Sequence, residues 1–242
     1  MALFENDAER NLLLIDKPSG MTSFDVIRCL RRQTGIRKFG HAGTLDPLAT
    51  GLLVLGCRSG TKRLSKLIKL DKTYQAEILL GQQRTTSDME GVVVAQQEVS
   101  TLIPESVLKQ HLDQLVGELH LPVSAFSAVK INGVPMYKRA HKAAKAGEVV
   151  TDVPKRIMRV YEAELLDTQL IELDQQQFQL VTVRFAVGSG TYIRSLTEAF
   201  GESLGYPACL YNLRRTRVGD FLLDDAVSLS SVNEDTIDEY LI

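Results

Sequence analysis

A twelve-residue run from Gly40 to Gly51, reading GHAGTLDPLATG, restricts the backbone of this chain more than any other stretch. Its three glycines allow positive φ angles and a close approach of neighbouring backbone. Pro47 fixes its own φ and drives Asp46 towards an extended conformation, so the backbone aims the carboxylate. The apolar residues 52–56 that follow predict a short buried strand. The run, here called the aspartate turn, therefore predicts a rigid support for one functional acid.

An isolated Asp-Pro pair has a simpler explanation, which is a turn closed by a hydrogen bond from side chain to backbone. The whole run favours function, because it closely resembles the GHAGTLDP-type motif of the TruB family of tRNA pseudouridine synthases. In that family the aspartate of the motif is the catalytic residue, so the resemblance makes Asp46 the candidate nucleophile.

The resemblance covers roughly residues 11–229. It implies the pseudouridine synthase catalytic fold, an α+β fold with a central mixed or mostly antiparallel sheet, flanking helices and an active-site cleft. The alternation of hairpin-like pairs and helices along the chain also favours the α+β class. We expect a catalytic domain over residues 1–229 and a short acidic tail over 230–242, without the C-terminal PUA domain of many bacterial members.

Two further motifs implicate catalytic side chains. Tyr74 opens a strand in which apolar residues alternate, which makes it an ordinary core residue; the resemblance implies instead the tyrosine that stacks on the target base. Residues 188–196 resemble the GTYIR motif, whose arginine, here Arg194, pairs with the catalytic aspartate and keeps it ionised. The alternative is a surface pair between Arg194 and Glu198, four residues further along one helix.

The remaining motifs suggest RNA contacts. Residues 14–23 resemble the family's KPxGxTS motif, a strand end followed by a capped helix start that can bind anions; a direct substrate role for Lys17 and a structural one are equally open. His41 is expected to help fill the space left by an extruded base, and Leu213 to close the site or simply to belong to the core. The RNA-binding candidates are His41, Lys17, Gly43, Thr44, Lys130, Leu213 and Arg214.

The chain departs from the family pattern in two places. Val123 stands where a second proline is common in the segment that ends at Lys130, and His141 stands where arginine is usual. These departures concern details of RNA contact and leave the chemistry untouched.

The net charge of −2 is unusual for a nucleic-acid binder. Residues 220–242, however, contain seven acids and no Lys or Arg, so taking those seven charges away from −2 leaves +5 for the rest. Basic residues cluster at 28–38 and 58–69, on both sides of the aspartate turn. Such runs are commonly solvated helix faces; their position here favours contact with RNA.

Periodicity predicts the main helices. Thr22 or Ser23 should cap a helix that buries Phe24, Ile27 and Leu30. A second helix should start at Pro104, with an apolar stripe that runs as far as Leu119. Shorter or later helices are expected over 61–68, from Tyr137 and from Thr191, and strands over 11–15, 74–80, 92–95, 123–130, 153–173, 178–187 and 210–218.

Composition excludes several classes. The sequence contains no stretch of about 18 apolar residues, so no membrane span is predicted. Residues 1–7 lack the features of a signal peptide. The three cysteines are far apart and predict reduced thiols in a cytoplasmic protein. The four histidines show no metal-ligand spacing with them, so neither a metal nor a cofactor is expected. A monomer is the default expectation.

The resemblance implies an isomerase that converts uridine 55 in the T loop of tRNA into pseudouridine, with the T stem-loop as its partner. One alternative is a non-catalytic tRNA-binding or tRNA-folding protein, which would not need a carboxylate facing phosphates. Another is a glycoside or nucleoside hydrolase, which usually needs two flanking carboxylates. A third is a synthase that acts on another RNA.

Overall fold

The computed structural model describes residues 11–125, 130–131, 133–136, 139–140 and 153–242. The chain forms two compact units. The first contains Met1–Gln75 and Leu213–Ile242, and the second contains Ala76–Asn212. The chain passes from one unit to the other within β4 (Lys72–Leu80) and again within β12 (Ala208–Val218).

The first unit is built on a mixed sheet with the strand order β14-β1-β3-β12. β1 pairs with β3 antiparallel and with β14 parallel, whereas β12 pairs with β3 parallel. Two short strands extend the sheet, since β2 pairs with β3 and β13 pairs with β12. The bounds are β1 (Leu12–Lys17), β2 (Phe39–His41), β3 (Thr50–Cys57), β13 (Phe221–Leu222) and β14 (Val227–Ser228). β1 and β3 are almost fully buried, as the apolar sequence over 52–56 predicts.

Helix α1 (Ser23–Thr34) begins where the sequence predicts. Thr22 caps it and forms a capping box with Asp25, and Gly35 ends it with a φ of +69°. The predicted helix over 61–68 is the 3-10 turn η2 (Arg58–Arg63) followed by the short α2 (Leu64–Leu67).

Phe24 corrects one prediction, because its side chain is 53% exposed. The buried face of α1 consists of Ser23, Val26, Ile27, Leu30 and Thr34. Phe24 lies one residue beyond the start of that face, about 100° around the helix, and so points away from the core. The guanidinium groups of Arg28 and Arg31 lie 5.8 Å from its ring centroid and cover part of its apolar surface.

The acidic C-terminal segment packs on the first unit. It contains η3 (Leu223–Asp225), η4 (Leu229–Ser231) and η5 (Ile237–Glu239), and it buries Val232, Ile237 and Leu241. Ile242 exchanges two backbone hydrogen bonds with Leu12. The acidic side chains therefore belong to a segment that buried apolar side chains hold against the first unit.

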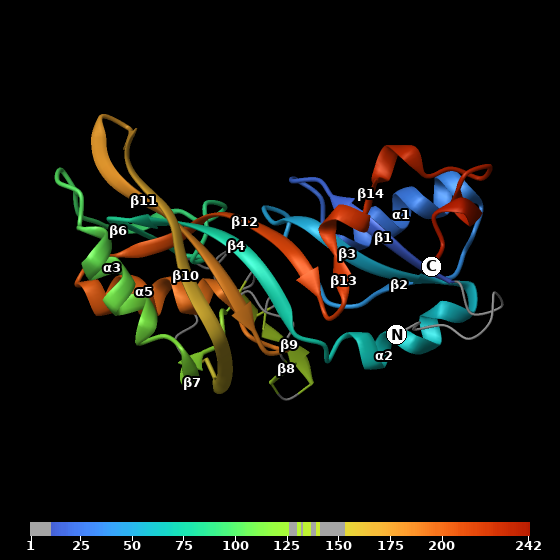
Figure 1. Cartoon of the computed structure of the whole chain (residues 1–242), viewed down its shortest axis with the longest axis horizontal. Helices are drawn as coiled ribbons and strands as arrows, with labels where there is room; N and C mark the ends of the chain where they lie inside the picture. Colours follow the sequence, from blue (N-terminus) through green and yellow to red (C-terminus); the bar gives the residue numbers. More distant parts are fainter. Residues whose placement is uncertain (1–10, 126–129, 132, 137–138, 141–152) are drawn as a thin grey trace. The chain divides into compact units, whose positions relative to one another are not determined.

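The second unit is built around the long hairpin of β10 (Lys155–Leu173) and β11 (Gln176–Val187), which Figure 1 shows in yellow and orange. Its strand order is β12-β4-β11-β10-β7, in which β7 is Gly117–Pro122. Two small antiparallel sheets complete it, namely β5 (Gln82–Arg84) with β6 (Val93–Gln96), and β8 (Lys130–Ile131) with β9 (Val134–Pro135).

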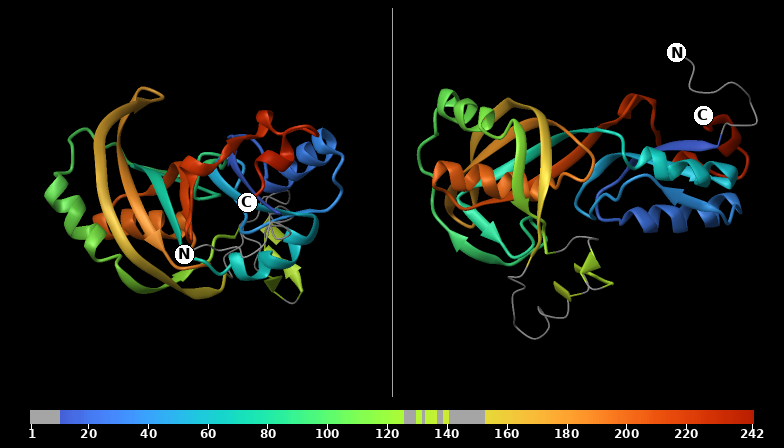
Figure 2. Two further views of the ribbon diagram at one scale, coloured as in Figure 1. Left: turned by 45° about the vertical axis from the view of Figure 1, so that its right-hand side comes forward. Right: turned by 90° about the horizontal axis from the view of Figure 1, so that it is seen from below.

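Within its described residues, the second unit has two helices with defined bounds. α3 (Glu105–Asp113) and α5 (Ile193–Leu204) lie side by side next to the long hairpin, as both views in Figure 2 show. A hydrogen bond of 3.0 Å joins His111 Nδ1 on α3 to Ser203 Oγ on α5.

The helix that starts at Pro104 is shorter than predicted. It ends at Asp113, and Leu119, expected on its apolar stripe, belongs to β7. A turn follows Asp113, and β7 begins at Gly117, whose φ of +122° is not helical. Of the expected strand over 123–130, residues 123–125 are not in a strand, Lys130 begins β8, and 126–129 lie outside the described residues.

The observed architecture confirms the α+β class with a mixed sheet and flanking helices. The predicted basic helix from Tyr137 and the departure at His141 fall largely outside the described residues.

Glycine is required at position 51 for two reasons, which an alanine variant would test. Its φ is +95°, and a Cβ would meet the backbone oxygen of Arg215 and lie 2.8 Å from its nitrogen, where β12 approaches β3. We expect Gly51→Ala to lower the free energy of unfolding in urea by about 3 kcal/mol, from backbone strain plus this clash.

The matched control is Gly35→Ala, because Gly35 also has a positive φ but nothing within 4 Å of the added methyl group. It should lose only about 1 kcal/mol. Equal losses at the two positions would show that the close approach of β12 does not matter.

Candidate active site

The aspartate turn is held from several sides by hydrogen bonds to its backbone. The hydroxyl of Ser23 at the start of α1 accepts from Leu45 N at 2.8 Å and donates to Leu45 O at 3.1 Å. Within the turn Ala49 N donates to Asp46 O at 3.1 Å. The Asp46 side chain is half-buried at the surface of the turn. A backbone held this firmly fixes the direction of its carboxylate.

Lys17 is one of these supports. It is 0% exposed, and its ammonium group donates to the carbonyls of Pro18 at 2.8 Å, Met21 at 2.6 Å and Pro47 at 3.3 Å. Gly20 N also donates to Pro47 O at 2.9 Å. The lysine therefore ties the segment after β1 to the residue next to Asp46.

Arg215 supports the turn from the opposite strand. It is 1% exposed; its Nε donates to Leu52 O at 2.7 Å and its Nη2 donates to Gly43 O at 3.2 Å. Gly43 has a φ of +102°, which turns its carbonyl group into reach. β12 is thus joined to the start of the turn and to β3 through one side chain.

Lys72 is a second buried cation behind Gly43. A Cβ placed on Gly43 would lie 3.5 Å from Arg215 Nη1 and 3.8 Å from Lys72 Cε. The Lys72 ammonium donates to Ile68 O at 2.6 Å and to Leu70 O. Burial, and then the charge of Arg215, lower the pKa of Lys72 to about 8, although Asp71 opposes the shift. Lys72 was not among the predicted site residues. Its position two residues before Tyr74 could have suggested it.

His41 lies near the start of the turn, at the end of β2. Burial lowers its pKa, and the charge of Arg215 acts in the same direction, against a hydrogen bond with the Gly43 backbone. Its buried Nδ1 has no hydrogen-bond partner among the described residues. A neutral imidazole suits stacking on a base better than an ion pair with a phosphate.

The other candidates of the first unit lie on neighbouring strands. Tyr74 is buried in β4, and Leu213 is buried in β12. Arg214 makes a bidentate pair with Asp16, at 2.7 and 3.1 Å. Thr44 is exposed within the turn. Lys130 belongs to β8 in the second unit, and its side chain lies outside the described part of the chain.

Arg194 lies in the first turn of α5 in the second unit and is 5% exposed, which does not fit a surface pair with Glu198. Its Nη1 donates to Thr86 O at 3.1 Å and lies 3.7 Å from the carboxylate of Asp88, which is also buried. Asp88 was not foreseen. In the sequence Asp88 stands in a polar segment, residues 85–91, which predicts only a loop between two strands.

The first unit thus contains Asp46, His41 and Tyr74 and three buried cations, Lys17, Lys72 and Arg215, whereas the second holds Arg194 against Asp88. One carboxylate on a rigid turn can act as a nucleophile or as an electrostatic partner of a developing cation. Among the described residues no group of three or more His, Cys, Asp or Glu side chains could hold a metal ion. The three cysteines are free thiols, as predicted.

None of the helices that the described residues form combines the length and apolar character that a bilayer crossing demands.

Comparison with known proteins gives consistent matches. The family model for TruB family pseudouridylate synthase (N terminal domain) matches residues 31–193. Curated relatives named tRNA pseudouridine synthase B include one from Corynebacterium efficiens, 43% identical over 95% of this chain and 74% of the relative. Another, from Leifsonia xyli, is 44% identical over 91% of this chain and 71% of the relative.

Solved structures agree with these matches. A Cbf5-Nop10-Gar1 complex contains a chain that is 27% identical, with a TM-score of 0.67 over 96% of this chain and 58% of that chain. An H/ACA RNP bound to a substrate RNA containing 2′-deoxyuridine contains one that is 25% identical, with a TM-score of 0.64 over 93% and 52% of the two chains.

The lowered pKa of Lys72 predicts a dependence of stability on pH. Between pH 8 and the ordinary lysine value of 10.5, the unfolded chain binds more protons than the folded one. The wild type should therefore gain free energy of unfolding relative to Lys72→Met as the pH rises from 7.5 to 10, by about 1 kcal/mol after screening by solvent.

Urea unfolding at the two pH values measures this difference, with Lys69→Met, an exposed lysine of the same segment, as the control for deleting a positive charge. A gap between wild type and Lys72→Met that stays constant from pH 7.5 to 10 would contradict the prediction.

Proposed function

Because this chain belongs to the TruB family of pseudouridylate synthases, we propose that it isomerises uridine to pseudouridine in tRNA, at uridine 55 of the T loop. Family membership over most of the chain supports the reaction. The observation that carries the choice of catalytic residue is the aspartate turn, whose backbone Lys17, Ser23 and Arg215 hold from three elements.

The reaction determines what the site must provide. The bond between uracil N1 and ribose C1′ breaks, the uracil rotates, and a bond forms between C1′ and C5, after which C5 loses its proton and N1 is protonated. The nucleotide must first leave the base stack, and water must be kept from the detached base. An enzyme needs an anionic group beside C1′ and C6 at that stage, and we assign this role to Asp46.

Two further residues complete the proposed catalytic set. Tyr74 is assigned to stack on the flipped uracil and to assist proton transfer at C5. Arg194 is assigned to orient and stabilise the Asp46 carboxylate. The resemblance to the family motif supports this assignment, and the bond to Thr86 O and the nearby Asp88 carboxylate restrict the guanidinium of Arg194.

The proposed RNA contacts differ in character. His41 and Leu213 would pack against the displaced base, and Gly43 and Thr44 would present the backbone of the turn. Lys17 would act through the turn, since its ammonium group is engaged by carbonyls. Arg214 would keep its pairing with Asp16 or exchange it for a phosphate. Lys130 completes the set as an RNA-binding candidate.

We further propose that the protein works as a monomer in the cytoplasm, where it meets tRNA, and that it uses neither metal nor cofactor. An acidic group, an aromatic ring and an arginine suffice for an isomerisation in which the substrate supplies all the atoms.

Asp46→Asn tests the assignment directly. The amide keeps the size of the side chain and removes the anion, so tritium release from C5-labelled uridine in a T stem-loop RNA should fall at least about 1,000-fold. Affinity for the same RNA, measured by filter binding, should stay within about threefold, because most of the binding energy comes from loop shape and phosphates.

Asp220→Asn is the control, since this acid is exposed on the same unit, and it should release tritium at the wild-type rate. Binding without tritium release by the wild type itself would reject the proposed reaction on this RNA and favour a binding or folding role.

A further inference from the structure

A strained backbone turn lies next to Arg194. Ser87, in the loop between β5 and β6, has a φ of +63°, in the left-handed region that side chains other than glycine rarely adopt. Such a conformation costs about 1 kcal/mol or more. It persists only where the surrounding contacts outweigh that cost, so the contacts of Ser87 indicate what maintains it.

Those contacts come from three directions. The Ser87 hydroxyl donates to the Glu198 carboxylate on α5 at 2.7 Å. Its carbonyl accepts from Leu210 N on β12 at 2.9 Å, and its own N donates to Arg84 O at 3.0 Å. Ser87 is buried, so the bond to a carboxylate is a charge-assisted bond in a partly shielded place.

The turn determines where the partners of Arg194 lie. Thr86, just before Ser87, supplies the carbonyl that accepts from Arg194 Nη1, and Asp88, just after it, supplies the carboxylate 3.7 Å from that nitrogen. Asp88 is fixed in turn by the Thr86 hydroxyl and by Glu90 N. A change of φ at Ser87 would move Thr86 O and the Asp88 carboxylate at once.

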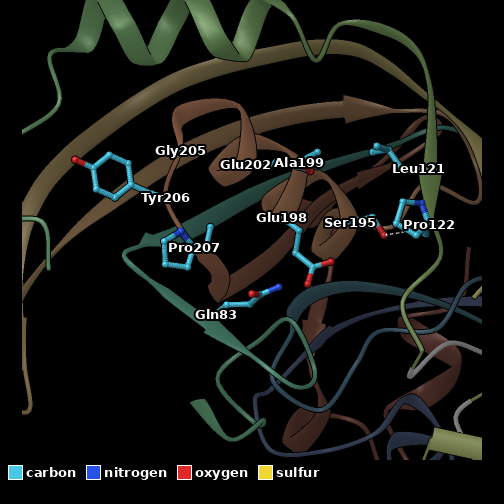
Figure 3. A pocket seen from close by; sticks show the side chains of 11 residues that line it. Gln83, Leu121, Pro122, Ser195, Glu198, Ala199, Glu202, Gly205, Tyr206 and Pro207 are labelled. Atoms are coloured by element: carbon cyan, nitrogen blue, oxygen red, sulfur yellow. Dashed lines mark hydrogen bonds between the residues drawn. The ribbon is translucent and has the colours of Figure 1, made fainter. Parts of the chain in front are cut away.

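Glu198 lies one helical turn after Arg194 on α5. The same rigid helix therefore carries the guanidinium and the carboxylate that holds the loop against it. Glu198 also lines a cavity of about 570 Å³ beside α5, together with Gln83, Ser195 and Glu202. Figure 3 shows its carboxylate pointing towards the Gln83 side of this cavity.

We propose that Glu198 and Ser87 are positioning residues for pseudouridine formation. Glu198 holds Ser87 in its left-handed conformation, which places Thr86 O and the Asp88 carboxylate against Arg194. The proposal rests on the proposed function in one respect, namely that Arg194 serves the catalytic carboxylate. It concerns two residues that touch neither the RNA nor the reacting atoms.

The decisive comparison uses two variants of Ser87. Both Ser87→Ala and Ser87→Gly remove the hydroxyl, but only glycine adopts positive φ without strain. We expect Ser87→Ala and Glu198→Ala to lower kcat for tritium release about 30-fold with KM within about twofold. Ser87→Gly should be at least about tenfold faster than Ser87→Ala, and adding Ser87→Gly to Glu198→Ala should recover most of the loss.

Glu202→Ala is the control, because Glu202 lines the same cavity one turn further along α5; it should keep the wild-type kcat. Glu198→Gln, whose amide oxygen can still accept from Ser87, should lose less than Glu198→Ala. Equal impairment of the Ala and Gly variants at Ser87, or a wild-type kcat for Ser87→Ala, would overturn the proposal.

A readout independent of activity separates this proposal from the proposed function. The ¹⁵Nε–¹H NMR signal of Arg194 should be sharp in the wild type and Ser87→Gly, and shifted or broadened in Ser87→Ala. If the wild type released no tritium from any tested RNA, the function would fail, yet an unchanged Arg194 signal in Ser87→Ala would still refute the positioning role, and a shifted signal would support it.

Discussion

The hydrogen bonds of Arg215 to the carbonyls of Gly43 and Leu52 are the interaction on which the first unit depends. One buried guanidinium joins β12 to β3 and to the start of the aspartate turn, and it also influences its ionisable neighbours, since its charge lowers the pKa of both Lys72 and His41. Burial of two cations so close together is unfavourable without compensation. Here backbone carbonyls supply it, and the same bonds hold the turn that carries Asp46.

Local patterns in the sequence predicted much of this architecture. Thr22 marks the start of α1 because a cap depends on neighbouring residues, and the apolar run after Gly51 forms the predicted buried strand, β3. The failures occurred where tertiary contacts decide. Phe24 is exposed under two arginines, and Leu119, expected on the stripe of α3, instead pairs with Met158 of β10. No local pattern could show that Asp88 would meet Arg194, since more than 100 residues separate them.

The two units support their chemistry in different ways. In the first, cations bind backbone carbonyls and fix the direction of one acid. In the second, a carboxylate on α5 holds a loop in a conformation that serine alone would avoid, and the loop holds an arginine of the same helix. The resemblance to a known family predicted Asp46, Tyr74 and Arg194 as catalytic residues, but it did not predict these supports. They depend on φ angles and buried contacts that a motif does not encode.

The first unit contains both ends of the described chain, with Ile242 bonded to Leu12, whereas the second is one continuous segment. During translation the segment Ala76–Asn212 leaves the ribosome while the sheet of the first unit still lacks β14 and part of β12. The second unit can therefore fold first, and the β1–β3 pair must wait with its apolar face uncovered. The sheet of the first unit is thus completed only by residues 213–242, long after its own β1–β3 pair has been made.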